Sequence, residues 1–369
     1  EGHYDSMTRF VMSSPHRVLI VGGGPAGLAA AYRLRDAGCQ IDVVEQAPVF
    51  GGLARTLSWP SRACPGLTWK ADIGVHRLHS ATAPEVLGDL RSLLGEDLLE
   101  RPRRGLIFLE GRQLRYPLSL GGLLRGMSPA TALRCAADAF RASLRKDGSA
   151  PRSYDEAVAR RFGNTLNRIF YAPYAEKVWG RPPGELSAIQ ATKRITTRGF
   201  GALLLKAMGG RTPKFYYYPR RGYGQMAEAL ENAVRDHGAC RLRAGTRVAF
   251  VEAGGNRTRR IGLVGPDGAA EELEFDYLLW TGSFESLAAA VRGAPAPAPQ
   301  TSLEWRAGHI LHVCLDTPSV GDADAYYFPT TDVPFNRVSD QKKFSPDMVP
   351  ADKTVLCLDF TDREGSRRS

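Results

Sequence analysis

The first strongly patterned segment of the chain is an apolar run that leads into glycines and then into a helical repeat. Residues 18–21 are all apolar, and small or apolar residues recur at helical spacing from there to Gly38. A second apolar run then ends in an acid, Glu45. This order predicts a βαβ unit, in which a helix joins two parallel strands.

Helical and alternating patterns follow one another along the rest of the chain. Ser153 and Glu156 have the Ser-x-x-Glu spacing of a capping box, which marks the first turn of a helix. Helical composition and spacing predict helices over 119–145, 153–162, 165–175 and 226–236. Alternation and turn residues predict a hairpin over 106–114, a strand at 247–251, a hairpin turn at 265–268, a buried strand at 276–282, and strands of a second sheet at 309–315, 325–328 and 354–360.

The glycines of the first unit indicate a dinucleotide site. Gly22, Gly24 and Gly27 have GxGxxG spacing, which permits a tight turn, close approach to a pyrophosphate and close packing of helix on sheet. Pro25 and Ala26 complete the turn, whose helix N-terminus attracts the diphosphate. Glu45 is placed to accept hydrogen bonds from the ribose hydroxyls, which argues against a 2′-phosphate.

A second glycine pair selects the nucleotide. Gly51 and Gly52, with Arg55 just after them, follow the ribose acid directly, and this arrangement resembles the signature of flavoproteins, which favours FAD over NAD. The neighbouring residues that we assign to the same FAD site are Gln46, Leu53 and Ala54.

The 369 residues exceed the roughly 250–300 at which a single core stops growing, so we expect two domains. The predicted fold is α/β, a Rossmann-like FAD-binding domain with an inserted helical region and a second mixed or antiparallel sheet. An Ala-Pro connector at 294–299 is stiff. The expected division is a leader or tag (1–13), the FAD-binding domain (14–105 and 222–293), a largely helical substrate or cap region (106–221) and sheet strands of the substrate domain (294–369).

The charge and the cysteines limit the partners. The net charge of +10 is spread along the chain without a recognisable nucleic-acid module, so an anionic small substrate is the favoured explanation. The six cysteines form no CxxC pair or metal-ligand spacing, which favours a reduced, cytoplasmic setting without a metal. No run of about 18 apolar residues predicts a membrane span. The oligomeric state stays open.

Four blocks of the chain resemble flavoenzymes of the UDP-galactopyranose mutase type and the related protoporphyrinogen-oxidase-like, amine-oxidase-like FAD proteins. The first block is the βαβ fingerprint with its second glycine pair. The others are 73–79 (IGVHRLH), 174–180 (YAEKVWG) with 185–187 and 193–198, and 333–338 (VPFNRV). The third and fourth blocks are the more selective, since they occur in the mutase order and at similar separation.

The resemblance implies roles for particular residues. Gly74, Val75 and His76 would lie against the flavin ring, and Val248, Thr281 and Gly282 would return the chain to the FAD-binding domain. His76 is the nearest candidate for a general base, because histidine titrates near neutral pH. A metal pair of His76 and His79 is the alternative, but no acid or cysteine is spaced with them.

The resemblance also implies a substrate site, for which each residue has a structural alternative. Trp179 would stack near a nucleotide-sugar ligand, or it belongs to the core. Arg198 and Arg337 would grip a diphosphate, or they are surface charges and structural ion pairs. Tyr218 and Phe335 are also assigned to this site, although the row of tyrosines at 216–218 is more typical of strand packing than of chemistry.

Relatives of this kind continue beyond the strand that matches 354–361 into a segment with active-site tyrosines that closes over the flavin. Here the sequence stops at Ser369. Two readings follow: the chain is cut short, or part of the flavin site has been lost.

Three functions are therefore open. The first is an FAD-dependent oxidoreductase that passes a hydride from an anionic, sugar-nucleotide or glycosidic molecule to flavin N5. The second is a redox-neutral mutase that contracts the ring of a UDP-sugar with reduced FAD. The third is a degenerate, non-catalytic nucleotide-binding protein. The net redox change distinguishes the first two, and we favour the oxidoreductase.

Overall fold

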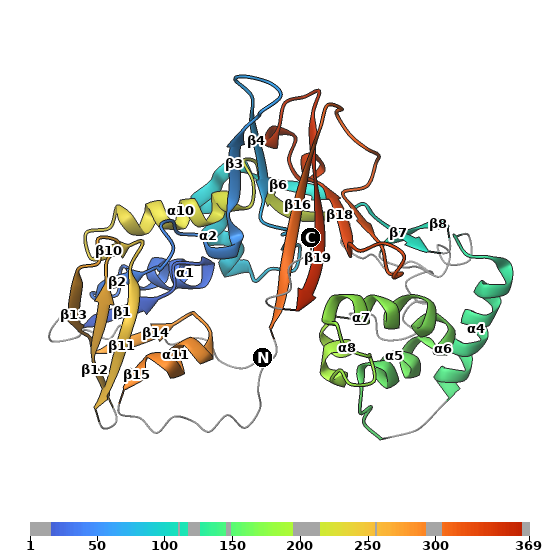
Figure 1. The fold of residues 1–369 in the computed structure, drawn as a ribbon, viewed down its shortest axis with the longest axis horizontal. Coiled ribbons are helices and arrows are strands. Elements are labelled where there is room, and N and C mark those ends of the chain that lie inside the picture. The colour runs from blue at the N-terminus through green and yellow to red at the C-terminus, as the bar shows by residue number, and fades with distance from the viewer. Residues whose placement is uncertain are drawn as a thin grey trace. The chain divides into compact units, whose positions relative to one another are not determined.

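The computed structural model describes residues 16–109, 111–116, 126–144, 149–194, 215–254, 257–292 and 305–363. The chain forms two compact units that alternate along the sequence (Figure 1). The first unit holds Glu1–Leu57, Thr82–Leu98 and Pro219–Ser302, and the second holds Ser58–Ala81, Leu99–Tyr218 and Leu303–Ser369. Each unit is described by itself.

The first unit is built on a four-stranded parallel sheet with the strand order β10-β2-β1-β14. Its strands are β1 (Arg17–Val21), β2 (Gln40–Val44), β10 (Cys240–Arg243) and β14 (Tyr277–Trp280). The helix α1 (Pro25–Leu34) joins β1 to β2 and packs with α10 (Gly224–Arg235) on one face of the sheet. The predicted βαβ unit and the helix over 226–236 are therefore confirmed.

The other face of this sheet packs against a second sheet of the first unit, in the order β13-β12-β11-β15. Its strands are β11 (Arg247–Gly254), β12 (Arg257–Val264), β13 (Ala270–Glu274) and β15 (Val291–Arg292). The turn at 265–268 joins two antiparallel strands as predicted. The expectation of a buried strand at 276–282 was wrong in one respect: β14 lies at the sheet edge, where Tyr277 is 57% and Leu279 is 39% exposed.

The second unit contains a six-stranded sheet with the order β16-β19-β18-β17-β7-β8. The strands are β7 (Gly105–Leu109), β8 (Arg112–Tyr116), β16 (Arg306–Leu315), β17 (Ala325–Tyr327), β18 (Arg337–Asp340) and β19 (Thr354–Arg363). All of the predicted strands between 309 and 360 are present, and so is the 106–114 hairpin. The hairpin joins the same sheet because β7 pairs in parallel with β17.

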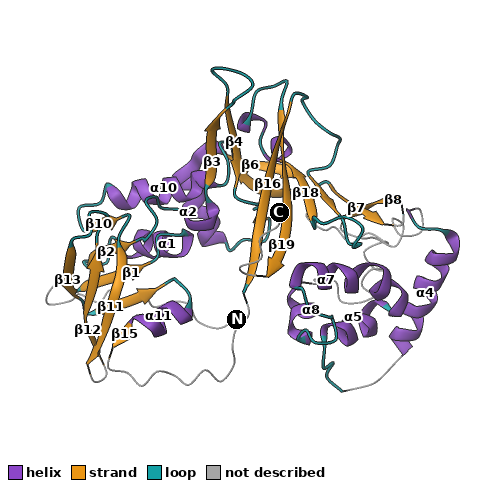
Figure 2. Cartoon of the chain, in the orientation of Figure 1, coloured by secondary structure: helices purple, strands orange, loops and turns teal. Residues whose placement is uncertain are grey.

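The helices of the second unit pack on the β7–β8 hairpin. They are α4 (Pro129–Leu144), α5 (Tyr154–Phe162), α6 (Asn164–Leu166), α7 (Ala172–Trp179) and α8 (Ala188–Arg194) (Figure 2). The Ser153 hydroxyl accepts from the Glu156 N–H at 3.2 Å, which confirms the predicted cap of α5. The first part of the predicted helix over 119–145 lies outside the described residues.

The predicted helix over 165–175 is confirmed, but it is longer and irregular. It runs through α6, a π-helical turn η3 (Asn167–Tyr171) and α7. Pro173 lies in the first turn of α7 and has no N–H to donate to the carbonyl of residue 169. This missing donor explains why the wider turn occurs here.

Short elements complete the two units. They are η1 (Gly52–Ala54), β3 (Thr56–Pro60), β4 (Thr68–Asp72), β5 (Leu78–His79), α2 (Pro84–Leu94), η2 (Gly95–Asp97), β6 (Leu98–Pro102), β9 (Phe215–Pro219), α11 (Phe284–Ala290), α12 (Gln341–Phe344) and η4 (Pro346–Met348). Among the described residues, no helix has the length and apolar character needed to cross a bilayer.

Candidate functional site

The first glycine turn lies at the carboxyl edge of the parallel sheet, between β1 and α1. Gly22 has φ 107°, and a Cβ there would lie 2.2 Å from the hydroxyl of Thr281. A Cβ at Gly27 would lie 1.9 Å from the carbonyl oxygen of Gly22. Both positions therefore exclude any side chain, as the GxGxxG spacing predicts.

The N-terminus of α1 is open to an anion. No side chain caps it, and its first turn holds no acidic residue. Pro25 and Ala26 are exposed at this end. The first N–H groups of a helix carry a partial positive charge, so the arrangement suits a diphosphate.

The second glycine turn packs directly against the first. The Gly51 N–H donates to the Gly23 carbonyl at 2.8 Å, and a Cβ at Gly52 would lie 3.1 Å from the Cα of Gly24. Arg55 closes this turn, since its Nε donates to the carbonyl of Gly52 at 2.9 Å. The two backbone segments approach closely here, and the positive φ of Gly51 (102°) and Gly52 (53°) favours glycine at both positions.

Glu45 follows β2 at the same edge. Its carboxylate accepts from the N–H groups of Gly23 and Ala47, each at 2.7 Å. A carboxylate has about four lone-pair positions, so these two bonds fix its direction and leave acceptors for ribose hydroxyls. Gly23 was missed by the sequence reasoning, although it bonds to both the acid and the second glycine turn. The signal was present as the middle residue of Gly22-Gly23-Gly24.

The structure does not bring the other predicted cofactor residues of the first unit together at one point. The Thr281 hydroxyl donates to the Val21 carbonyl at 2.9 Å, so it supports the turn. Leu53, Gln46 and Gly282 are exposed, Ala54 is buried, and Val248 is half-buried against the second sheet. The backbone cradle and Glu45 fit a dinucleotide, and the individual assignments stay predictions.

The flavin-side residues belong to the second unit. Gly74 has φ 80°, and the loop that contains it also carries Val75 and His76. The ring Nε2 of His76 lies 2.7 Å from the carbonyl oxygen of Ile73 and so donates to it. This bond orients the imidazole. Its role against the flavin and as a general base stays a prediction.

Tyr218 lies in the core of the second unit. Its side chain is 0% exposed, and its hydroxyl donates to the carboxylate of Asp72. A fully buried side chain offers no surface to a substrate. The placement therefore favours the packing alternative for the tyrosine row, and it gives no support to substrate contact by Tyr218.

Arg337 is likewise committed to a partner within the protein. Its Nε donates to the Asp359 carboxylate at 2.6 Å, and its Nη2 forms a second bond to the same oxygen. Burial disfavours the charged guanidinium, but Asp359 and the nearby Tyr327 and Tyr174 outweigh that effect and raise the pKa of Arg337. This geometry is that of a structural ion pair. Phe335 packs edge-on against Phe328 at 4.9 Å between ring centres.

A cavity of about 380 Å³ in the second unit brings together the third and fourth resembling blocks. It is lined by Lys177, Gly180, Arg306, Thr331, Val333, Pro334, Thr361 and Asp362. Trp179 ends α7 beside it and packs against the helical core, as its structural alternative predicts. The predicted diphosphate ligand Arg198 lies outside the described residues.

Two cations line this cavity. Lys177 donates to the carbonyls of Phe328 at 2.9 Å and Thr330 at 2.7 Å. Burial lowers the pKa of Lys177 to about 8, against the opposing effect of Asp332. The guanidinium of Arg306 lies where a Cβ of Gly180 would be, and its Nε is buried with no acceptor among the described residues. Sequence reasoning missed Arg306, for which no motif signal exists.

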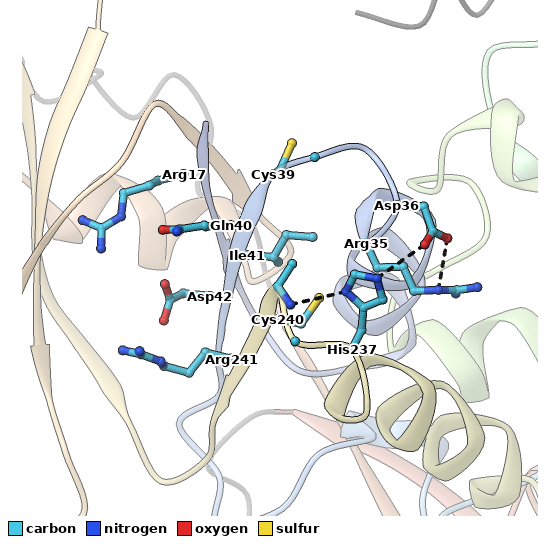
Figure 3. Close-up of a pocket in the computed structure, with 13 residues that line it drawn as sticks. Arg17, Arg35, Asp36, Cys39, Gln40, Ile41, Asp42, His237, Cys240 and Arg241 are labelled. Atoms are coloured by element: carbon cyan, nitrogen blue, oxygen red, sulfur yellow. Dashed lines mark hydrogen bonds and ion pairs between the residues drawn. The ribbon is translucent and has the colours of Figure 1, made fainter. Parts of the chain in front are cut away.

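A larger cavity lies at the opposite edge of the parallel sheet. Figure 3 shows that Arg17, Gln40 and Cys240, the first residues of β1, β2 and β10, line it. Its volume is about 780 Å³. Ligands of open α/β sheets bind at the carboxyl ends of the strands, so this cavity is not the dinucleotide site. Within the described ranges, no group of three or more His, Cys, Asp or Glu side chains is arranged to hold a metal ion.

Short segments of the chain are similar to known proteins. The L-amino-acid oxidase of Crotalus adamanteus is 44% identical over 66 residues, which are 18% of this chain and 11% of that protein. The thiamine thiazole synthase of Aeropyrum pernix is 44% identical over 52 residues, or 14% of this chain and 18% of that protein. The matches thus span less than a fifth of these relatives.

The fold as a whole is similar to solved structures. The structure of a reduced UDP-galactopyranose mutase superposes with a TM-score of 0.78 at 22% identity and covers 96% of this chain and 75% of that one. An oxidoreductase from Methanosarcina mazei superposes with a TM-score of 0.65 at 17% identity, covering 94% and 79%. At these identities the likeness shows a common α/β fold with a Rossmann-like domain.

The family follows from a match along nearly the whole chain. The model of the family "Flavin containing amine oxidoreductase" matches residues 25–364. The flavin that the family requires agrees with the dinucleotide that the glycine turns and Glu45 fit. The chain therefore belongs to the flavin-containing amine oxidoreductases and has FAD as its cofactor.

Proposed function

We propose that this protein is an FAD-dependent oxidoreductase that oxidises an anionic small molecule, a sugar nucleotide or glycoside. The observation that carries the anionic character is the cavity of the second unit, where Lys177 and Arg306 face the same space. The Nε of Arg306 is buried there and has no acceptor among the described residues. A buried donor without a partner costs free energy that an anionic ligand would recover.

The residues of the first unit divide the binding of FAD between backbone and side chain. The N-terminus of α1 would hold the diphosphate, and Glu45 would accept the ribose hydroxyls. The glycine turns would allow the backbone to approach both. Bound FAD supplies the hydride acceptor at N5.

The residues of the second unit would orient the substrate. Lys177 and Arg306 would hold its anionic group. Their attraction would outweigh the repulsion from Asp362, the one carboxylate among the residues that line the cavity. Orientation of this kind lowers a barrier because the entropy of alignment is lost on binding. We assign proton removal to His76. We also keep the proposed functional division into an FAD-binding domain (14–105 and 222–293), a largely helical substrate or cap region (106–221) and substrate-domain strands (294–369), although residues 58–81 and 99–105 fold with the second compact unit.

Anaerobic mixing of the flavin-loaded protein with UDP-sugars and other oxidisable anions tests the oxidoreductase. The expected result is stoichiometric bleaching of the flavin absorbance by one of these compounds, together with an oxidised product. Conversion of a UDP-sugar without net oxidation would contradict it.

A redox-neutral UDP-sugar mutase is the second candidate. It is favoured because residues of the two mutase-like blocks line one cavity. These residues are Lys177 and Gly180 of one block and Val333 and Pro334 of the other. A mutase needs its FAD reduced, so it would form the furanose only after treatment with dithionite. Product formation from UDP-galactopyranose with and without dithionite therefore separates the two functions.

A further inference from the structure

The imidazole of His76 is oriented by the first residue of its own loop. Its Nε2 donates to the carbonyl of Ile73 at 2.7 Å, so the direction of the ring follows that of Ile73. Ile73 comes directly after β4, whose last residue is Asp72. The Asp72 carbonyl and the Ile73 N–H belong to one planar peptide unit. A contact that fixes the Asp72 carbonyl therefore fixes the start of the loop.

Asp72 is 1% exposed and is anchored through three of its groups. Its N–H donates to Oε1 of Gln341 at 3.3 Å, and its carboxylate accepts from the hydroxyl of Tyr218. Its carbonyl accepts from Nε2 of His312 at 3.0 Å. A carbonyl only accepts, so this nitrogen of His312 carries a hydrogen. Gln341 and Tyr218 are fully buried, whereas His312 is half-buried, so His312 is the partner that can be replaced with the least harm to the fold.

His312 is itself held in place by its strand and by a neighbouring ring. It lies on β16, which pairs with β19 along its whole length. Its imidazole packs against the ring of Trp59 with 5.5 Å between the ring centres. Ile310 lies two residues earlier, on the same face of the strand, and its Cδ1 is 3.8 Å from the place of a Cβ on Gly74. The strand thus meets the His76 loop both at its start and at its glycine.

We propose that His312 is a positioning residue for proton removal by His76. Its Nε2–H fixes the Asp72 carbonyl, and the Asp72–Ile73 peptide passes that orientation to the carbonyl that holds the His76 ring. All of these residues belong to the second unit. The inference rests on the proposed function in one respect, the assignment of proton removal to His76. The chain of contacts transmits position and not protons, because both histidine bonds end at main-chain carbonyls, which only accept.

Amide hydrogen exchange over residues 73–77 of the flavin-loaded protein tests the positioning. His312→Phe keeps a ring against Trp59 but removes the donor, so exchange in this segment should accelerate about tenfold, because a buried carbonyl loses its partner. His312→Gln supplies an amide donor in place of Nε2 and should restore the slow exchange. The matched control on the same strand is His309→Phe, since Nε2 of His309 bonds to no described residue. It should leave the exchange unchanged.

The visible absorbance of the bound flavin is a second readout, and it needs no substrate. Because the His76 loop is assigned to the flavin side, its loosening in His312→Phe should shift the absorbance maxima, and His312→Gln should restore them. With a substrate, His312→Phe should lower kcat at least about tenfold and leave KM unchanged, because alignment is lost and binding is kept.

Three results would overturn the proposal. The first is wild-type exchange over residues 73–77 in His312→Phe. The second is faster exchange throughout the second unit, which would show a role in stability alone. The third is a loosened loop with an unaltered flavin spectrum. Failure to find any oxidisable substrate would contradict the proposed function instead, and the exchange and absorbance measurements would still decide the role of His312.

Discussion

Short sequence motifs predicted both the carboxyl edge of the sheet in the first unit and the polar residues of the second unit. The two predictions differ in their outcome. At the edge, the key groups are backbone atoms and one acid, which hydrogen-bonds to Gly23 and Ala47. In the second unit, Tyr218 and Arg337 are each committed to a carboxylate of the protein itself. Motifs that specify backbone geometry are therefore more dependable than motifs that specify a long polar side chain.

The strongest way to break the backbone side of this comparison is Gly27→Ala. The new Cβ would lie 1.9 Å from the carbonyl oxygen of Gly22, so the turn or the helix must move. We expect loss of bound flavin and a fall of at least about 4 kcal/mol in the free energy of unfolding. Flavin absorbance and urea denaturation measure the two effects.

The matched control is Gly88→Ala in α2, where a Cβ would meet no atom within 4 Å. Because alanine favours a helix over glycine, this variant should gain about 0.5–1 kcal/mol and keep its flavin. Equal behaviour of the two variants would contradict the close approach at Gly27.

The side-chain part of the comparison is tested most directly by Arg337→Ala. It leaves the Asp359 carboxylate, whose side chain is only 12% exposed, without its cation. We expect a loss of about 3 kcal/mol in the free energy of unfolding, since an unpaired buried charge is costly. The double variant Arg337→Ala, Asp359→Ala should lose less. A stable single variant that has lost only substrate affinity would restore the diphosphate role.

Glu45→Ala should weaken FAD retention while leaving the fold intact. Hydrogen bonds to a charged group contribute about 2 kcal/mol, so the dissociation constant for FAD should rise about thirtyfold. Titration of the flavin-free protein with FAD measures it. Because Glu45→Gln keeps one of the two acceptor oxygens, its loss should be smaller.

Tyr218→Phe sharpens the comparison by removing one hydroxyl from the core. Its hydrogen bond to Asp72 would be lost, which should cost about 1–2 kcal/mol of stability because Asp72 is 1% exposed. The KM for any substrate found should stay unchanged. A raised KM with unchanged stability would show that the tyrosine contacts the ligand after all.

The smallest expected effect concerns pH. Burial lowers the pKa of Lys177 to about 8, so this ammonium is charged below that pH and loses its charge above it. The affinity for an anionic probe such as UDP should therefore fall several-fold between pH 7 and pH 9, as about one favourable ion contact is lost. In Lys177→Gln, calorimetric titration should find weaker binding without this pH dependence.

Several elements of the fold were accessible from pattern alone. The capping box at Ser153, the hairpin over 106–114 and the strands between 309 and 360 all depend on residues close together in sequence. The π-helical turn before Pro173 and the exposed edge position of β14 were not predicted. The first depends on how a missing N–H is accommodated, and the second on which strands pair.

The sequence by itself determined the dinucleotide cradle, because glycine spacing and one acid fix backbone geometry over a short stretch of chain. Only the tertiary structure decided which charged side chains are available to a ligand. Asp359 lies on the strand paired with that of Arg337. Arg306 and Lys177, more than 120 residues apart in sequence, line one cavity, and the Nε of Arg306 has no acceptor among the described residues. Such partners are set by strand pairing and packing between distant segments, which no local pattern records.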